Sequence, residues 1–194
     1  MSKEHATGQR IKYSEKTGNI FVEPECNDNY RLVLGCLENS KNPLFIICMN
    51  PSSADKDMAD RTINRIIYIK NKLGYDGWVV FNLYPERATK PSDLKGKNKK
   101  YDPDLARENL DTIKKYINKY NVEEVMGAWG NINGCEILNN GKKDVLELLN
   151  DLDIKVFCYG ETKQGEPRHP MQRFISPDDL YKKENRHYYE NRRN

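Results

Sequence analysis

Residues 45–52 read Phe-Ile-Ile-Cys-Met-Asn-Pro-Ser, and this stretch decides the fold that we expect. Its Ile-rich apolar part predicts a buried strand. The cluster that follows, residues 50–53 (Asn-Pro-Ser-Ser), is typical of a turn that ends such a strand. In an open α/β sheet, ligands bind at the carboxyl ends of buried strands, so Asn50 is expected to point into a crevice. An ordinary strand-to-loop turn is the alternative.

Other apolar runs predict strands that alternate with helices. The strands are expected at 30–36, 43–49, 78–83, 122–129 and 154–159, and the helices at 60–73, 105–120 and 134–149. This alternation indicates the α/β class, with a mainly parallel sheet covered on both faces. We expect one α/β domain over residues 29–176. A polar arm or hairpin precedes it at 1–28, and a basic, aromatic helix or tail follows it at 177–194.

The composition limits the function classes. The chain has 194 residues, 31% of them charged, and a net charge of only +3, which permits contact with nucleic acid without requiring it. No apolar run is long enough to span a bilayer, so no membrane partner is expected. The five cysteines form no Cys-x-x-Cys pair and no zinc spacing, which favours a reducing cytoplasm and no metal. Walker A, Rossmann and nucleophile-elbow motifs are absent, and no cofactor is expected. The oligomeric state stays open.

Four predicted strands end in polar segments that would gather at one edge of the sheet. Asn50 and Asn82 offer paired carboxamides, which suit the donor and acceptor edge of a neutral heterocycle. The alternative is that both amides satisfy backbone groups of their loops. His169, between Arg168 and Pro170, is a candidate acid, base or oxyanion donor. Its alternative is an ordinary surface histidine.

Charged and aromatic side chains supply secondary candidates. The basic residues Lys163, Arg168, Arg87 and Arg61 are candidates for phosphate binding. Asp55 and Asp60 flank the turn after the first strong strand and are expected to cap the next helix, with a catalytic carboxylate as the alternative. Trp129 offers a flat face for stacking, or is simply part of the core.

Six segments, taken in order, resemble an uncharacterised bacterial and phage family, the domain of unknown function 1643. The resemblance covers about residues 28–172. The six segments are residues 49–55, 60–62, 82–83, 87–89, 128–130 and 165–170. The family name conveys no activity.

A more distant similarity is to the uracil-DNA glycosylases. Asn50-Pro51 resembles their first motif, which positions the attacking water; residues 79–83 resemble the strand whose Asn reads the pyrimidine edge. Trp129-Gly130 and His169-Pro170 resemble two later motifs, the second of which stabilises the departing base. The resemblance implies a three-layer sandwich with a central four-stranded parallel sheet. It departs after Pro170, where Met171-Gln172-Arg173-Phe174 replaces the usual Ser-Pro and apolar wedge.

The leading hypothesis is therefore a glycosylase-like protein that binds a nucleobase and hydrolyses an N-glycosidic bond in DNA or in a nucleotide. Its catalytic residues would be Asn50 and His169. The base- or substrate-binding set would be Pro51, Ser52, Ser53, Asn82, Arg87, Thr89, Trp129 and Gly130. The alternative is a non-catalytic nucleic-acid or nucleotide binder, related to phage or defence, which uses the basic stretch at 90–101 and the tail. A third option is an enzyme that acts on free modified nucleotides.

Overall fold

The computed structural model describes residues 10–14, 17–88, 93–94, 99–171 and 175–190. Its main sheet contains β2 (Phe21–Glu23), β3 (Val33–Cys36), β4 (Pro43–Cys48), β6 (Gly77–Asn82), β7 (Glu124–Gly127), β8 (Lys155–Tyr159) and β9 (Arg186–Tyr188). A second, two-stranded sheet pairs β1 (Ile11–Lys12) with β5 (Met58–Ala59). The helices are α1 (Arg61–Leu73), α2 (Pro103–Tyr120), α3 (Glu136–Asp151), α4 (Pro177–Leu180) and the 3₁₀ turn η3 (Lys183–Asn185).

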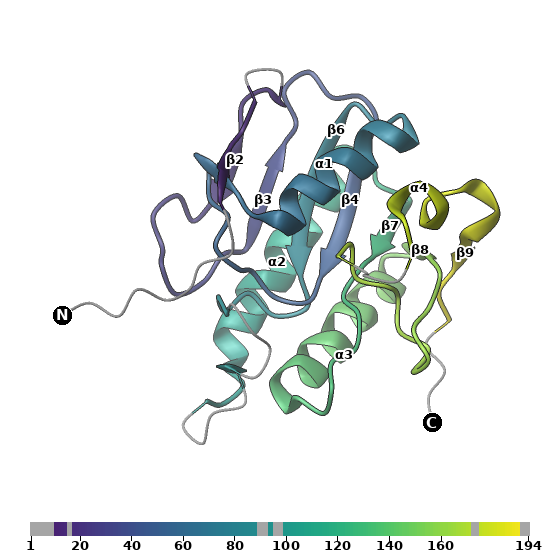
Figure 1. The fold of residues 1–194 in the computed structure, drawn as a ribbon. Coiled ribbons are helices and arrows are strands. Elements are labelled where there is room, and N and C mark those ends of the chain that lie inside the picture. The colour runs from purple at the N-terminus through teal and green to yellow at the C-terminus, as the bar shows by residue number, and fades with distance from the viewer. Residues whose placement is uncertain (1–9, 15–16, 89–92, 95–98, 172–174, 191–194) are drawn as a thin grey trace.

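The main sheet is mixed and seven-stranded, in the order β2-β3-β6-β4-β7-β8-β9 (Figure 1). The four strands β6, β4, β7 and β8 run parallel to one another. Antiparallel strands extend both sides: β3 and β2 beyond β6, and β9 beyond β8. The α/β class is confirmed. The four-stranded sheet that the resemblance implies is not found, because the sheet has seven strands and is mixed. The added edge strands β2 and β9 have three residues each, too few for a periodic signal.

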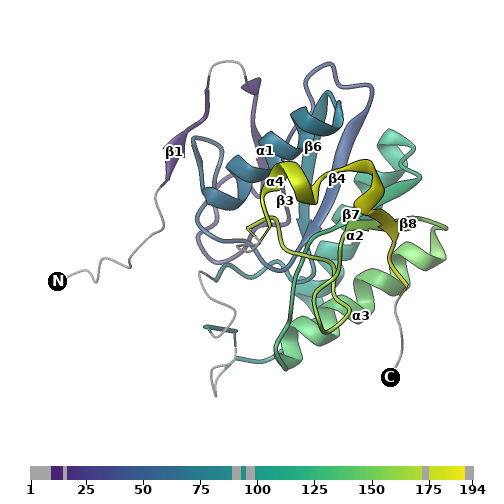
Figure 2. The same ribbon diagram turned by 45° about the vertical axis from the view of Figure 1, so that its right-hand side comes forward.

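Helices cover both faces of this sheet (Figures 1 and 2). On one face, Ile63, Ile66 and Ile69 of α1 pack with Ile46 and Val80 from the alternate positions of β4 and β6. On the other face, α2 and α3 pack against the remaining positions of the same strands, among them Phe45, Ile47, Val79 and Phe81. Both faces of β4 are therefore buried, as its unbroken apolar run predicts.

The boundaries of α1 follow from its sequence. Asp60 is the N-cap, and its Oδ1 accepts a hydrogen bond of 2.9 Å from the backbone N–H of Ile63. Gly74 ends the helix with a left-handed φ of 79°, which glycine adopts without a Cβ clash. The helix thus begins directly behind the loop that follows β4.

The terminal segments contribute to both sheets. In the predicted arm at 1–28, β1 pairs with β5, and β2 pairs with β3 in the main sheet. In the predicted helix or tail at 177–194, α4 is followed by η3 and by β9, which pairs with β8. Among the described residues, no helix has the length and apolar character needed to cross a membrane.

Gly141 provides a test of the packing between α3 and the sheet. A Cβ at this position would overlap the backbone oxygen of Leu83 and lie 3.0 Å from its carbonyl carbon. Helix propensity alone predicts that Gly141→Ala stabilises the protein by about 1 kcal/mol. Because α3 must move away from Leu83, we expect the opposite, a loss of about 1–3 kcal/mol in the free energy of unfolding in urea.

The control is Asn139→Ala, an exposed position on the same helix. It should leave stability unchanged or raise it by about 0.5 kcal/mol. A Gly141→Ala protein as stable as the control would contradict this packing.

Candidate functional site

The loops after the four parallel strands meet at one edge of the sheet. The chain leaves β4 for β6 on one side and then returns to β7 on the other side of β4. The loops after β4 and β7 therefore lead to helices on opposite faces, α1 and α3. Such a reversal of strand order opens a crevice at the carboxyl ends of the strands, where α/β proteins bind ligands.

Asn50 directs its amide nitrogen to loop carbonyls. Its Nδ2 donates to the backbone oxygens of Pro51, at 3.0 Å, and Ala88, at 2.8 Å. For the amide nitrogen, the structure therefore agrees with the alternative that Asn50 satisfies loop backbone groups. No hydrogen bond to Oδ1 is found within the described part of the chain, so the acceptor is the part of Asn50 left for a ligand or water.

Asn82 is fully buried, and its side chain has no protein partner. Its exposed fraction is 0%, and neither Nδ2 nor Oδ1 forms a hydrogen bond with any described residue. Its backbone oxygen, in contrast, accepts a 3.0 Å hydrogen bond from Nδ2 of Asn109. An unpaired buried polar group costs about 1–3 kcal/mol, so native proteins rarely keep one without a reason.

His169 lies directly against Gly130. A Cβ on Gly130 would lie 3.1 Å from the His169 Cβ, a tight contact. Gly130 also has a φ of +69°, a conformation that residues with a side chain rarely adopt. The N–H of Gly130 also donates to the Pro167 carbonyl at 2.8 Å. The ends of β7 and of the loop after β8 are therefore joined.

The protonation of His169 follows from its surroundings. Burial lowers its pKa from 6.5 to about 4, and the only opposing influence is the charge of Asp60. The ring is thus neutral at pH 7. Its Nδ1 accepts a hydrogen bond of 3.2 Å from the N–H of Met171. The single ring proton must then be on Nε2, which makes Nε2–H a donor.

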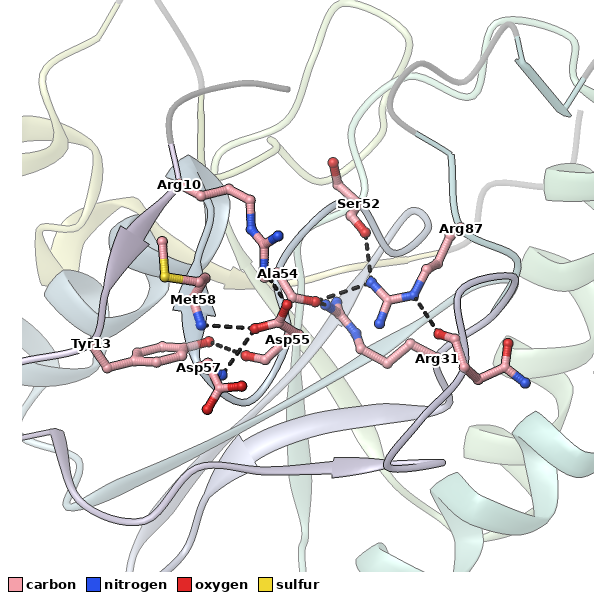
Figure 3. A network of polar contacts seen from close by, with 10 residues as sticks. Arg10, Tyr13, Arg31, Ser52, Ala54, Asp55, Asp57, Met58 and Arg87 are labelled. Atoms are coloured by element: carbon pink, nitrogen blue, oxygen red, sulfur yellow. Dashed lines mark hydrogen bonds and ion pairs between the residues drawn. The ribbon is translucent and has the colours of Figure 1, made fainter. Parts of the chain in front are cut away.

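Two arginines hold the loop after β4 (Figure 3). Arg31 and Arg87 both donate to the backbone oxygen of Ala54, at 2.8 and 3.0 Å. Arg87 also donates to the backbone oxygens of Ser52, at 2.8 Å, and Asn27, at 3.2 Å. Most N–H groups of Arg87 therefore donate to backbone oxygens of the protein, so this side chain is poorly suited to bind phosphate.

Asp55 shapes the same loop. Its Oδ1 accepts from the N–H groups of Asp57 and Met58, at 2.9 and 2.8 Å, and it also forms an ion pair with Arg10 (Figure 3). Burial raises the pKa of Asp55, but these hydrogen bonds and the Arg10 charge outweigh it and hold the pKa below its usual value. Asp60 caps α1, as expected, whereas Asp55 caps the turn at residues 55–58 and not the helix.

Trp129 belongs to the core. It is 0% exposed, its Nε1 donates to Glu166 at 2.6 Å, and Tyr189 packs edge-on at a centroid distance of 5.3 Å. Glu166 also pairs with Lys142 at 2.6 Å. Because protein groups surround the indole, the proposed stacking face of Trp129 is not available to a ligand.

The remaining predicted residues are dispersed. Arg61 and Lys163 are exposed, on α1 and on the loop after β8, and the Arg168 side chain lies over Gly160. Pro51 is buried, whereas Ser52 and Ser53 are half-buried in the arginine-bound loop. Thr89 lies outside the described residues.

Two buried polar side chains, Arg31 and Tyr181, were not among the predicted site residues. Arg31 is 3% exposed, and its Nε has no partner among the described residues; the same holds for the hydroxyl of Tyr181. Burial raises the pKa of the Cys48 thiol to about 12, an effect that Arg31 opposes and Asp60 reinforces. Cys48 is also aligned with Asn82 in the sheet. The one available signal was Arg31, a charge inside an apolar strand-like run.

A family model for proteins of unknown function, DUF1643, matches residues 30–171. The chain belongs to this family. Searches of curated proteins and of solved structures returned no match. In this member of the DUF1643 family, the matched segment contains Asn50, Asn82, Gly130 and His169, and it ends directly after the His169-Pro170 pair.

The low pKa of His169 predicts how stability depends on pH. The unfolded chain takes up a proton near pH 6.5, and the folded one only near pH 4. Stability should thus fall as the pH drops through this range, by up to about 3 kcal/mol. His169→Asn, which keeps an acceptor near Nδ1, should remove that part of the dependence. Urea unfolding of both proteins at several pH values measures the difference, and parallel curves would refute the assignment.

Proposed function

We propose that this protein binds a nucleobase and hydrolyses an N-glycosidic bond, in DNA or in a nucleotide. The observation that carries the proposal is the Asn82 carboxamide, which is fully buried and has no partner for either polar atom among the described residues. A base offers what this amide lacks, namely a donor and an acceptor side by side on one edge. Pairing with a base would therefore recover the free energy that the unpaired groups cost.

His169 supplies the second part of the proposed chemistry. When the bond between the sugar carbon and the base nitrogen breaks, its electron pair leaves with the base and the sugar becomes electron-deficient. A neutral imidazole with its proton on Nε2 can donate a hydrogen bond to the anionic oxygen of the departing base. The low pKa of His169 favours this electrostatic role over proton transfer at neutral pH.

Asn50 supplies the third part. Because Nδ2 is bound to the Pro51 and Ala88 carbonyls, the orientation of the side chain is fixed. Its Oδ1 can accept a hydrogen bond from a water molecule, which would then attack the sugar carbon and become its new hydroxyl group. One water proton leaves to solvent.

The resemblance to uracil-DNA glycosylases supports the same assignment. The four motifs that resemble those of the glycosylases lie after β4, at the end of β6, after β7 and after β8. They follow one another along the chain in the same order as in the glycosylases. These four strands are the parallel strands at the centre of the sheet. The added antiparallel edge strands do not alter this arrangement.

The site is closed in this structure. Since Asn82 has no exposed surface, a base can reach it only if the surrounding loops separate. In duplex DNA, the base would also have to leave the helix. We therefore expect base binding to be slower than a simple diffusional encounter.

The first experiment measures base release. The protein is incubated with oligonucleotides that contain uracil, a thymine mismatch or hydroxymethyluracil, and with the corresponding nucleotides, and free base and abasic sites are quantified. Asn82→Leu should lower release by at least about a hundredfold, because the base edge loses its partners. The same variant should be more stable by about 1–3 kcal/mol, since it removes unpaired buried groups.

This opposite effect on activity and stability separates a binding role from a structural one. Asn139→Leu, an exposed carboxamide on α3, is the control and should release base at the wild-type rate. No release from any substrate would end the hydrolytic proposal. DNA binding that weakens with salt but survives Asn82→Leu would instead support the non-catalytic binder.

A further inference from the structure

A second cluster of reactive side chains lies at the far edge of the sheet. Strand β9 lies beside β8 (Figure 1). Their register places His187 opposite Cys158. Glu161 follows β8 in the loop that later reaches His169. The cysteine Sγ, a histidine ring nitrogen and a Glu161 carboxylate oxygen all lie within 4.8 Å of one another. We propose that Cys158, Glu161 and His187 bind a zinc ion.

Two of the three separations between the ligand atoms match those of a metal site. His187 Nε2 lies 3.4 Å from Cys158 Sγ and 3.2 Å from Glu161 Oε1. In a tetrahedral zinc site, with Zn–N and Zn–O bonds of about 2.0 Å and Zn–S of about 2.3 Å, those separations are about 3.5 and 3.3 Å. The third pair, Cys158 Sγ and Glu161, lies within 4.8 Å.

The second nitrogen of His187 is arranged as in a metal-bound histidine. Its Nδ1 lies 3.2 Å from the backbone oxygen of Asn185, an acceptor, so Nδ1 can hold the ring proton when Nε2 binds a metal. Asn185 is itself fixed, since its Nδ2 donates to the backbone oxygens of Asp179, at 2.7 Å, and Leu180, at 3.2 Å. Such outer contacts orient metal ligands.

The chemistry of the ligand set favours zinc over magnesium or calcium. Sulfur and imidazole nitrogen are ligands of zinc and similar transition metals, whereas magnesium and calcium prefer oxygen alone. A thiolate and a carboxylate together neutralise the two positive charges of the ion. On binding, the S–H bond of Cys158 breaks, an S–Zn bond forms, and the proton leaves to solvent. A water molecule can complete the fourth position.

The position of the cluster indicates what the ion would do. It would join β8, β9 and the first part of the loop at 160–170. That loop is closed by a bridge between Glu161 and Pro167, two residues before His169. A metal here would therefore fasten the base of the loop that positions His169. The inference stands on the cluster itself and does not depend on the proposed base hydrolysis.

No metal is expected from the sequence, because it contains no Cys-x-x-Cys pair and no zinc-binding spacing of Cys and His. The three ligands instead lie at 158, 161 and 187, with Glu161 and His187 separated by 26 positions. Only the pairing of β9 with β8 brings them together. His187, which lies in the C-terminal segment predicted at 177–194, becomes the central ligand.

The test is direct metal binding by the full-length chain. The protein is stripped with a chelator and titrated with Zn²⁺ against a chromophoric competitor, and separately with Co²⁺ while the near-ultraviolet absorbance is recorded. We expect one equivalent of Zn²⁺ to bind, and Co²⁺ to give a thiolate charge-transfer band. Glu161→Gln and His187→Gln should each weaken binding by at least about tenfold, and Cys158→Ser should abolish the cobalt band.

Three controls keep the result interpretable. Cys26→Ser and Glu184→Gln alter an exposed thiol and an exposed carboxylate outside the cluster and should bind as the wild type does. Zn²⁺ should raise the melting temperature of the wild type but not of Glu161→Gln, whose fold in the absence of metal should be intact. Absence of stoichiometric binding, or binding that is unchanged in Glu161→Gln and His187→Gln, overturns the proposal.

Discussion

The burial of β4 on both faces is the constraint on which the rest of this structure depends. The strand lies between β6 and β7, and its alternate side chains enter the two separate cores formed with α1 and with α2 and α3. A strand so enclosed can meet solvent only at its ends. Because the chain departs from it toward opposite sides, the polar loop after Cys48 lies where the helices of the two layers diverge. The candidate site follows from this placement.

The loops at that edge are held by side chains that bind backbone groups. Arg31 and Arg87 share the Ala54 carbonyl, Asp55 and Asp60 cap backbone N–H groups, and the amide nitrogen of Asn50 links two loops. Most of the polar residues near the strand ends therefore stabilise backbone. Against that background, Asn82 is distinctive, since both polar atoms of its buried side chain lack a partner among the described residues.

The sequence predicts the centre of this protein better than its margins. Unbroken apolar runs such as residues 45–49 identify the parallel strands, and apolar spacing identifies α1, α2 and α3, because burial itself produces those patterns. The short strands β2 and β9 carry no such pattern, since they exist only through pairing with a neighbour. At the site, the loops after β7 and β8 bring Gly130 next to His169. The sequence does not distinguish a buried Trp129 from an exposed one, or an Arg87 that binds carbonyls from one that binds phosphate, because those differences arise from tertiary contacts.

The short strand β9 also has a consequence for self-association. Strand β8 would otherwise present an open row of backbone donors and acceptors at the margin of the parallel sheet, a surface that readily recruits a strand from another molecule. The last described residues cover that row, and Arg186 fixes them through Glu124, at 2.5 Å, and through the Phe157 ring, at 4.2 Å. A chain shortened before α4 would lose the buried Leu180 and Tyr181 as well as this cover. The C-terminal strand thus replaces the five-residue edge of β8 with a three-residue edge, a weaker template for aggregation.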